Sequence, residues 1–395
     1  MTLEEIQKQH DAALMPTYGR FPVALAQGKG ATATDVEGRS YVDFGSGIGV
    51  NSMGYCDEGW VTAVSKQAAR LQHISNLYYS PVQTAFAAEL CAATGMGRVF
   101  LCNSGAEANE CAIKLARKFS RDTYGEGRYE IITLRQSFHG RTMATLTATG
   151  QDALHVSFDP FLPGFSYVPA EDMDALRAAV TDRTCAVMLE CVQGEGGVIA
   201  LSDDYLRDVE RLCREKGLLM MVDEVQTGAG RTGKLLAFQY AGIHPDVVTM
   251  AKGLGGGLPI GACLCSEALK DVMGPGSHGS TFGGNPVVCA GARYILSRLT
   301  VPGFMEEVAR KGDYLREAIS AMPHVAEVRG RGMMIGVRLD TENARQIAEK
   351  CLQNGLLILT AKTLLRLLPP LTISQEEMDQ GLAILKTVLE GADEL

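Results

Sequence analysis

Residues 218–228 read Leu218-Leu219-Met220-Met221-Val222-Asp223-Glu224-Val225-Gln226-Thr227-Gly228, an apolar run that ends in a polar turn. Apolar residues that follow one another without alternation are typical of a strand buried on both faces, as in a parallel sheet covered by helices. Asp223 then stands at the carboxyl end of this strand, where open α/β sheets bind their ligands. An acid at a strand end is also a common helix cap, so its role depends on its neighbours.

Similar apolar runs lie on both sides of this strand, and segments with helical spacing of apolar residues separate them. The predicted strands cover residues 98–102, 130–134, 185–191, 218–222, 247–250 and 260–265, and two of the predicted helices cover 107–119 and 203–216. Strands that alternate with helices indicate a largely parallel sheet with helices on both faces. We therefore expect an α/β fold for this central region.

The two ends of the chain have a different pattern. The first thirty residues carry little pattern and predict an N-terminal arm, and residues 31–44 alternate around Glu37-Gly38, which predicts a hairpin. A helix at 286–299 leads to Pro302-Gly303, after which the pattern predicts a helix (304–321), strands (325–339), a helix (342–354), strands (356–373) and a helix (376–391). We predict three parts: an arm and hairpin that belong to a small domain (1–50), a large domain (51–301), and a C-terminal small α+β domain (302–395).

Composition narrows the class of protein. The chain has 395 residues and a net charge of −9, which disfavours nucleic acid as a partner. It contains no apolar run long enough for a membrane span, and its polar N-terminus is unlike a signal peptide. The 11 cysteines form no C-x-x-C pair. We therefore expect the cysteines to be small core residues, and the protein to lie in the reducing cytoplasm. No two histidines stand at metal-ligand spacing, and no metal site is expected.

Two further strand ends carry groups suited to an anion and to a carbonyl. Ser104-Gly105-Ala106 follow a predicted strand and open a helix, whose free N–H groups would face a phosphate. An ordinary serine-capped helix start explains that segment equally well. Lys252 ends another buried strand, and a lysine is rarely buried unless something holds it. Desolvation would lower the pKa of its amine and make it a nucleophile toward an aldehyde.

A glycine-rich segment offers a competing interpretation. Residues 228–234 fit the first part of a P-loop, G-x-x-x-x-G-K, but Leu235 stands where Ser or Thr must bind magnesium. A nucleotide triphosphatase is therefore disfavoured. Glycine makes up 44 of the 395 residues, about 11% against about 7% in average proteins, which indicates many tight backbone turns.

Four segments occur together in the order and spacing of a known family: 104–108 (Ser-Gly-Ala-Glu-Ala), 137–142 (Ser-Phe-His-Gly-Arg-Thr), 222–228 and 251–253 (Ala-Lys-Gly). In these segments the chain resembles the class III aminotransferases of fold type I, which carry pyridoxal 5'-phosphate. The resemblance extends from Tyr18 to Thr372. It implies a large domain with a mostly parallel, seven-stranded sheet sandwiched by helices, a smaller α+β domain, and a homodimer with active sites at the subunit interface.

The resemblance also implies roles for single residues. Lys252 would hold the cofactor aldehyde and move a proton between substrate and cofactor, and Asp223 would keep the pyridine nitrogen protonated. Phe138 would stack on the ring and Gln226 would bind its hydroxyl. His139 is interpreted as a packing residue without a part in the chemistry. The expected cofactor-binding residues are Ser104, Gly105, Ala106, Phe138, Asp223, Gln226, Lys252 and Thr281.

Substrate recognition is expected to depend on two arginines. Arg141 would bind the carboxylate remote from the reacting carbon, and Arg366 would bind the second carboxylate of a dicarboxylic substrate. Glu195 would pair with Arg366 when the amine donor is bound. Without the resemblance, each of these charges would be interpreted as a solvated ion pair. The expected substrate-binding residues are Tyr18, Ile48, Arg141, Glu190, Glu195, Ser280 and Arg366, with Ser280 and Thr281 reaching the other subunit.

Two positions bear on the substrate. Ile48 and the segment 76–79 resemble the branch of the family that acts on acylated ornithines, which implies that the amino group of N2-acetyl-L-ornithine passes to 2-oxoglutarate. Cys191 stands where the family usually has proline, so the loop after Glu190 loses a rigid backbone angle. Ornithine, succinylornithine, 4-aminobutyrate, acetyllysine and succinyl-diaminopimelate stay open as amine donors, and so does a cofactor-binding protein without catalytic activity.

Overall fold

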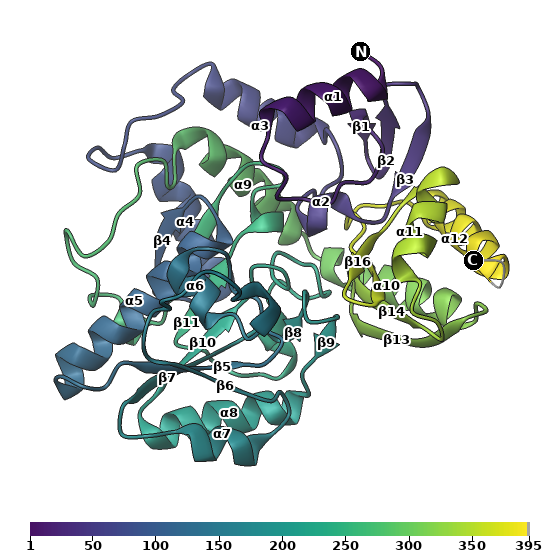
Figure 1. Ribbon diagram of the computed structural model, residues 1–395. Helices are drawn as coiled ribbons and strands as arrows, with labels where there is room; N and C mark the ends of the chain where they lie inside the picture. Colours follow the sequence, from purple (N-terminus) through teal and green to yellow (C-terminus); the bar gives the residue numbers. More distant parts are fainter. Residues whose placement is uncertain (393–395) are drawn as a thin grey trace.

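A seven-stranded sheet forms the centre of the large domain in the computed structural model, which describes residues 1–392 (Figure 1). Its strands lie in the order β4-β12-β11-β10-β7-β5-β6. β12 is antiparallel to both of its neighbours, and the other pairs are parallel. The strands are β4 (Arg98–Cys102), β5 (Glu130–Leu134), β6 (Phe165–Val168), β7 (Thr184–Leu189), β10 (Leu219–Asp223), β11 (Val247–Met250) and β12 (Gly261–Cys265).

Helices cover both faces of this sheet, which explains the uninterrupted apolar runs of its strands. In β10, Leu219 and Met221 join the hydrophobic cluster beneath α5, whereas Met220 and Val222 join the cluster that includes α8. The helices of this part are α3 (Glu58–Ala68), α4 (Pro81–Thr94), α5 (Gly105–Tyr124), α6 (Met143–Ala148), α7 (Met173–Ala179), α8 (Asp203–Lys216) and α9 (Pro286–Leu299). The predicted α/β fold with a mostly parallel sheet is confirmed.

The local sequence explains why α5 begins at the end of β4. The Ser104 hydroxyl accepts a hydrogen bond from the Glu107 N–H, and the Glu107 carboxylate accepts from the Asn103 N–H. Two first-turn contacts of this kind fix the helix start. The helix then buries a stripe of small residues that includes Ala108 and Ala112, which brings it close to the sheet.

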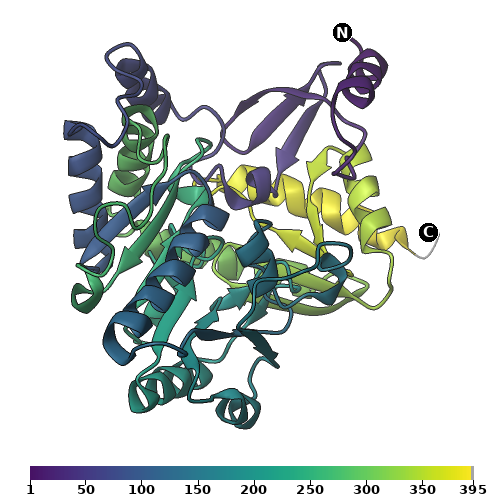
Figure 2. The same ribbon diagram turned by 60° about the vertical axis from the view of Figure 1, so that its left-hand side comes forward.

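The N-terminal and C-terminal segments share one sheet (Figure 2). The predicted hairpin is present as β2 (Thr32–Asp35) and β3 (Ser40–Asp43), and β1 (Leu25–Lys29) pairs with β2. β3 pairs in parallel with β15 (Leu356–Leu357), which lies more than 300 residues further along the chain. This pairing supports our assignment of residues 1–50 and 302–395 to one small domain, and the domain boundaries stay a prediction.

The C-terminal part follows the predicted order of helices and strands. A second four-stranded sheet has the order β13-β14-β17-β16, and α10, α11 and α12 complete this part. The elements are α10 (Phe304–Ser320), β13 (Val325–Arg331), β14 (Met334–Leu339), α11 (Ala344–Gln353), β16 (Leu359–Ala361), β17 (Leu364–Leu367) and α12 (Gln375–Glu390). No helix within residues 1–392 combines the length and apolarity of a membrane span.

The glycine-rich segment 228–234 connects the two domains. Arg231, which is 2% exposed, donates hydrogen bonds to the carbonyls of Met333 and Pro369 in the C-terminal part. Burial lowers the pKa of Arg231 to about 9, and the Asp43 carboxylate opposes that shift. The buried Arg231 side chain therefore links segment 228–234 to the C-terminal part of the chain. This structural role agrees with the interpretation of the segment as a glycine-rich loop and not as a P-loop.

Candidate active site

A cavity of about 470 Å³ lies at the carboxyl ends of the central strands. It brings together most of the residues that the sequence singled out, from five separate segments that follow β4, β5, β7, β10 and β11. The predicted site residues that line it are Ser104, Gly105, Ala106, Phe138, Arg141, Glu190, Asp223, Gln226 and Lys252. The cavity therefore lies where open α/β sheets bind their ligands.

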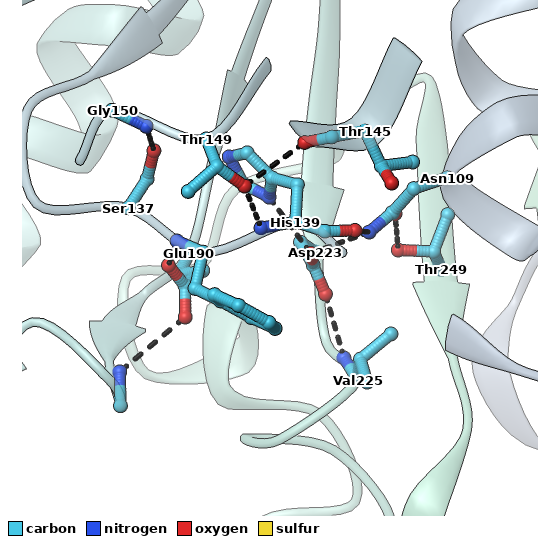
Figure 3. Close-up of polar contacts among 12 residues, drawn as sticks. Asn109, Ser137, His139, Thr145, Thr149, Gly150, Glu190, Asp223, Val225 and Thr249 are labelled. Carbon is cyan, nitrogen blue, oxygen red and sulfur yellow. Dashed lines mark hydrogen bonds and ion pairs between the residues drawn. The ribbon is translucent and has the colours of Figure 1, made fainter. Parts of the chain in front are cut away.

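Asp223 lines this cavity. Three polar contacts hold its carboxylate (Figure 3). Its Oδ2 accepts from Asn109 Nδ2 and lies 2.8 Å from His139 Nδ1, and its Oδ1 accepts from the Val225 N–H at 2.9 Å. The side chain is only 3% exposed. A buried carboxylate with fixed donors on both oxygens is oriented before any ligand arrives.

His139 differs from its sequence-based interpretation as a packing residue. Its ring makes the 2.8 Å contact with Asp223, and its Nε2 is buried without a hydrogen-bond partner among the described residues. Asn109 connects this pair to the sheet, because its Oδ1 accepts a hydrogen bond from the Thr249 hydroxyl at 2.7 Å. His139 and Asn109, which also line the cavity, therefore hold Asp223 in place together with Thr249.

The amine of Lys252 faces the same cavity, beyond the end of β11. Burial lowers the pKa of Lys252, and Glu195 is the strongest of the charges that oppose this effect. The residue has a φ of 44°, a left-handed conformation that is uncommon outside glycine. A desolvated amine with a lowered pKa is the form that reacts with a carbonyl and accepts a proton near neutral pH.

The start of α5 forms the wall suited to an anion. The N–H groups of Gly105 and Ala106 belong to the first turn, where no preceding helical carbonyl can accept them. A Cβ atom at Gly105 would lie 2.6 Å from Cγ1 of Val225, so a side chain here would push the Val225 segment away. Only glycine lets the helix end pack this closely on the turn after Asp223.

Phe138 and Arg141 form a third wall of the cavity. The Arg141 guanidinium lies 5.7 Å from the centre of the Phe138 ring, within the range of a cation–π contact. The Phe138 N–H donates to Glu190 Oε1 at 2.9 Å. Burial raises the pKa of Glu190 to about 7, a shift that His139 reduces and Asp223 increases.

An ion pair between a buried arginine and a partly exposed glutamate adjoins the cavity through Gln226. Arg366 Nη1 lies 2.5 Å from Glu195 Oε1, and Arg366 is 3% exposed. Gln226 Nε2 donates to Glu195 Oε1 at 3.3 Å, while Gln226 Oε1 accepts from Arg366 at 3.4 Å. Burial acts to raise the pKa of Glu195, but the charge and hydrogen bond of Arg366, together with Lys252 and Gln226, lower this pKa below its usual value. The pair is thus formed as the resemblance implied.

Six predicted residues do not line the cavity in the single chain. Two of them, Glu195 and Arg366, adjoin it through Gln226. Ser280 lies next to it, because its Oγ accepts from the side chain of Asn103, a cavity residue. Thr281 is exposed, and so are Tyr18 (73%) and Ile48 (42%). Their roles stay predictions, as do the roles assigned to the residues that line the cavity.

Sequence reasoning missed several supporting residues, although two of them carry a signal. Thr249 is a polar residue inside the buried run 247–250, and it stands opposite Asp223 in the parallel register of β10 and β11. Asn109 is a polar residue on the buried stripe of α5. Buried polar groups need partners, so each could have been predicted to face the other.

These groups fit pyridoxal 5'-phosphate. The helix start offers N–H donors to a phosphate, Lys252 offers an amine to an aldehyde, Asp223 offers a carboxylate to a ring nitrogen, and Phe138 offers an aromatic face. No group of three or more potential metal ligands occurs within residues 1–392. Fold and cavity together define an enzyme that uses this cofactor at the end of an α/β sheet.

Comparison with known proteins agrees with that class. The family model for class-III aminotransferases matches residues 14–389. An acetylornithine aminotransferase of Haemophilus ducreyi is 48% identical over 391 residues, which cover 98% of this chain and 99% of the relative. The chain belongs to the class III aminotransferases and is a pyridoxal-phosphate-dependent transaminase, so the resemblance seen in the sequence is confirmed.

Solved structures of the same family superpose closely. An ornithine aminotransferase of Toxoplasma gondii has a TM-score of 0.96 at 32% identity, covering 100% of this chain and 96% of that one. An N-acetylornithine aminotransferase of Stenotrophomonas maltophilia has a TM-score of 0.85 at 35% identity, covering 98% and 99%. The fold is therefore that of both enzymes, and overall similarity does not separate their substrates.

Glu224, the neighbour of Asp223, leads to a prediction about stability and pH. Its carboxyl accepts from the Thr227 hydroxyl and the Phe238 N–H, and burial raises its pKa from 4.5 to about 7. The folded protein therefore favours the neutral acid, and this contribution to stability is lost as pH rises from about 4.5 through 7. Glu224→Gln mimics the neutral form.

We expect Glu224→Gln to become more stable than the wild type as pH rises from about 5.5 to 8, by up to about 3 kcal/mol. Midpoints of urea unfolding measured across this pH range test the prediction, and the wild-type curve is the reference. Parallel curves for the two proteins would show that Glu224 does not titrate as proposed.

Proposed function

We propose that the protein transfers the δ-amino group of N2-acetyl-L-ornithine to 2-oxoglutarate, forming N-acetyl-L-glutamate 5-semialdehyde and L-glutamate in arginine synthesis. The observation that carries this proposal is the ion pair between the buried Arg366 and Glu195, joined to the cavity by Gln226. Acetylornithine aminotransferases among the relatives, 45–49% identical to this chain, support the same substrate.

The charges at the site match the two substrates. Acetylornithine carries one carboxylate, and Arg141 at the cavity wall binds it in a bidentate manner. 2-Oxoglutarate carries a second carboxylate, which takes the place of Glu195 on Arg366. A guanidinium that is covered by a carboxylate for one substrate and exposed for the other lets a single site handle both.

Each reactive group of the chain then has one task. The bound cofactor supplies an electron sink for the carbanion formed when the substrate loses a proton. The Lys252 amine would hold the cofactor and carry that proton, since its lowered pKa favours the neutral, accepting form. Asp223 would keep a proton on the ring nitrogen of the cofactor, and the donors around the carboxylate fix its orientation.

The function is tested by the ratio of kcat/KM for acetylornithine to kcat/KM for free ornithine, with 2-oxoglutarate as acceptor. We expect a ratio above about ten, because the second amine of ornithine would place an unpaired charge beside Arg141. A ratio below one would assign the protein to ornithine instead. Succinylornithine, 4-aminobutyrate, acetyllysine and succinyl-diaminopimelate complete the panel, and no turnover of any amine would favour a non-catalytic cofactor-binding protein.

A homodimer is part of the proposed function. Large apolar side chains are exposed at Leu77 (86%), Tyr78 (71%), Tyr79 (98%) and Phe282 (62%). The side chain of Asn76 donates to the carbonyls of Ser280 and Gly283, so the two exposed segments adjoin. An exposed apolar patch of this kind is typical of an interface.

The dimer can be tested directly in solution. We expect light scattering to give twice the mass of the chain, and Tyr79→Glu to shift the protein toward the mass of one chain. A wild-type protein with the mass of one chain would contradict the prediction. A cytoplasmic location also stays a prediction, supported by the 11 cysteines, all of which are unpaired within the described residues.

A further inference from the structure

Glu190 joins two loops of the active site through one carboxylate. It follows β7 directly, is 4% exposed, and lines the cavity. Its Oε1 accepts from the Phe138 N–H at 2.9 Å, and its Oε2 accepts from the Gly194 N–H at 3.3 Å. Both oxygens are thus engaged by backbone donors, which leaves Glu190 poorly suited to binding a substrate directly.

The Gly194 residue lies between Glu190 and Arg366. Its N–H is held by Glu190, and its carbonyl accepts a hydrogen bond from Arg366 Nη1 at 3.5 Å. A Cβ at this position would lie 2.2 Å from Oε1 of Gln226, so no side chain can anchor the residue. The backbone hydrogen bonds therefore set where the next residue, Glu195, stands relative to Arg366.

We propose that Glu190 is a positioning residue that keeps Glu195 over Arg366, and so sets the balance between the amine donor and the dicarboxylic acceptor. The inference rests on the proposed function, in which Glu195 covers Arg366 for the amine and leaves it for 2-oxoglutarate. Without the bond from Gly194 to Glu190, Glu195 leaves Arg366 more readily. When the amine donor is bound, Arg366 is then left without a partner, whereas 2-oxoglutarate pairs with Arg366 through its own second carboxylate.

A glutamine cannot replace Glu190 in this role. An amide has one oxygen acceptor, and its NH2 group would face the second N–H donor. Above the Glu190 pKa of about 7, at pH 8 for example, Glu190→Gln therefore keeps the size of the side chain but loses one of two charge-assisted hydrogen bonds. Because Phe138 and Gly194 are bound by different oxygens, loss of either bond disturbs the link between the two loops.

The test uses the cofactor-loaded enzyme and the two values of kcat/KM, each of which reports one half-reaction. For Glu190→Gln we expect kcat/KM for acetylornithine to fall about tenfold, the effect of one hydrogen bond to a charged group. We expect kcat/KM for 2-oxoglutarate to stay within about threefold of the wild type. Glu224→Gln, which neutralises another buried acid near Asp223, is the matched control and should leave the ratio of the two values unchanged.

A double-mutant cycle shows whether Glu190 acts through Glu195. In a Glu195→Gln background, Glu190→Gln should change the ratio by less than about twofold, since the group being positioned is already altered. An unchanged ratio in the single variant, an equal fall of both values, or full additivity in the cycle would each overturn the inference. If Glu190→Gln does not fold, Glu190→Asp, which keeps the charge but cannot reach both N–H groups, should give the same shift.

The outcome is separable from that of the proposed function. A wild type that uses ornithine better than acetylornithine overturns the substrate choice, and the same ratio measured with ornithine still decides the role of Glu190. A wild type that uses no amine overturns both proposals. A wild type active with acetylornithine, together with an unchanged ratio in the variant, overturns the inference alone.

Discussion

Lys252→Ala is expected to lower kcat by at least about 10³-fold, because removing a positioned acid–base group costs 10² to 10⁴ and this group also holds the cofactor. The structure shows no second amine that lines the cavity among the described residues. Lys252→Arg should be nearly as inactive, since a guanidinium stays protonated and cannot accept the proton. Glutamate formation from acetylornithine and 2-oxoglutarate measures both variants.

The matched control for this variant is Lys234→Ala. Lys234 is exposed and lies over the ring of Tyr240, away from the cavity, and it is the lysine of the P-loop-like segment. We expect its replacement to leave kcat within about twofold of the wild type. Retention of more than about 1% of kcat in Lys252→Ala would remove Lys252 from the chemistry.

The strands could be predicted closely because they are buried on both faces. β4, β5 and β11 have the predicted bounds, since an apolar run that begins and ends at polar residues marks its own limits. The sequence pattern does not predict β6, because β6 is an edge strand and only the last of its four residues is buried. Helix α1 (Leu3–Ala13) was also missed, because it buries no residue and depends on a capping box between Thr2 and Glu5.

Other features depend on contacts between distant segments. The parallel pairing of β3 with β15 joins two short strands whose local sequences carry no sign of each other. In the site, the motifs located Asp223 and Lys252, but the contact of His139 with Asp223 depends on how β5 and β10 lie in the sheet. Positions such as Ile48, which has a φ of 64°, depend on the fold around them.

Asp223→Asn is expected to lower kcat by about 10² to 10³-fold, the cost of removing one preorganised charge from an enclosed site. The change keeps the size of the side chain. It replaces a carboxylate that accepts hydrogen bonds from Asn109 and Val225 and contacts His139, whereas an amide offers only one acceptor oxygen. Without the negative charge, the facing ring nitrogen loses its proton and the cofactor withdraws electrons less strongly.

Two comparisons separate this effect from a loss of folding. Glu224→Gln neutralises the adjacent buried acid, which is not among the residues lining the cavity, and should keep kcat within about threefold of the wild type. Reconstitution of Asp223→Asn with a cofactor methylated on its ring nitrogen supplies a permanent positive charge, so activity should rise at least about tenfold relative to the ordinary cofactor. The same reconstitution should lower the activity of the wild type, because the methyl group would crowd the carboxylate. If the methylated cofactor leaves Asp223→Asn unchanged while the variant binds it, then Asp223 does not act by holding a proton on the ring.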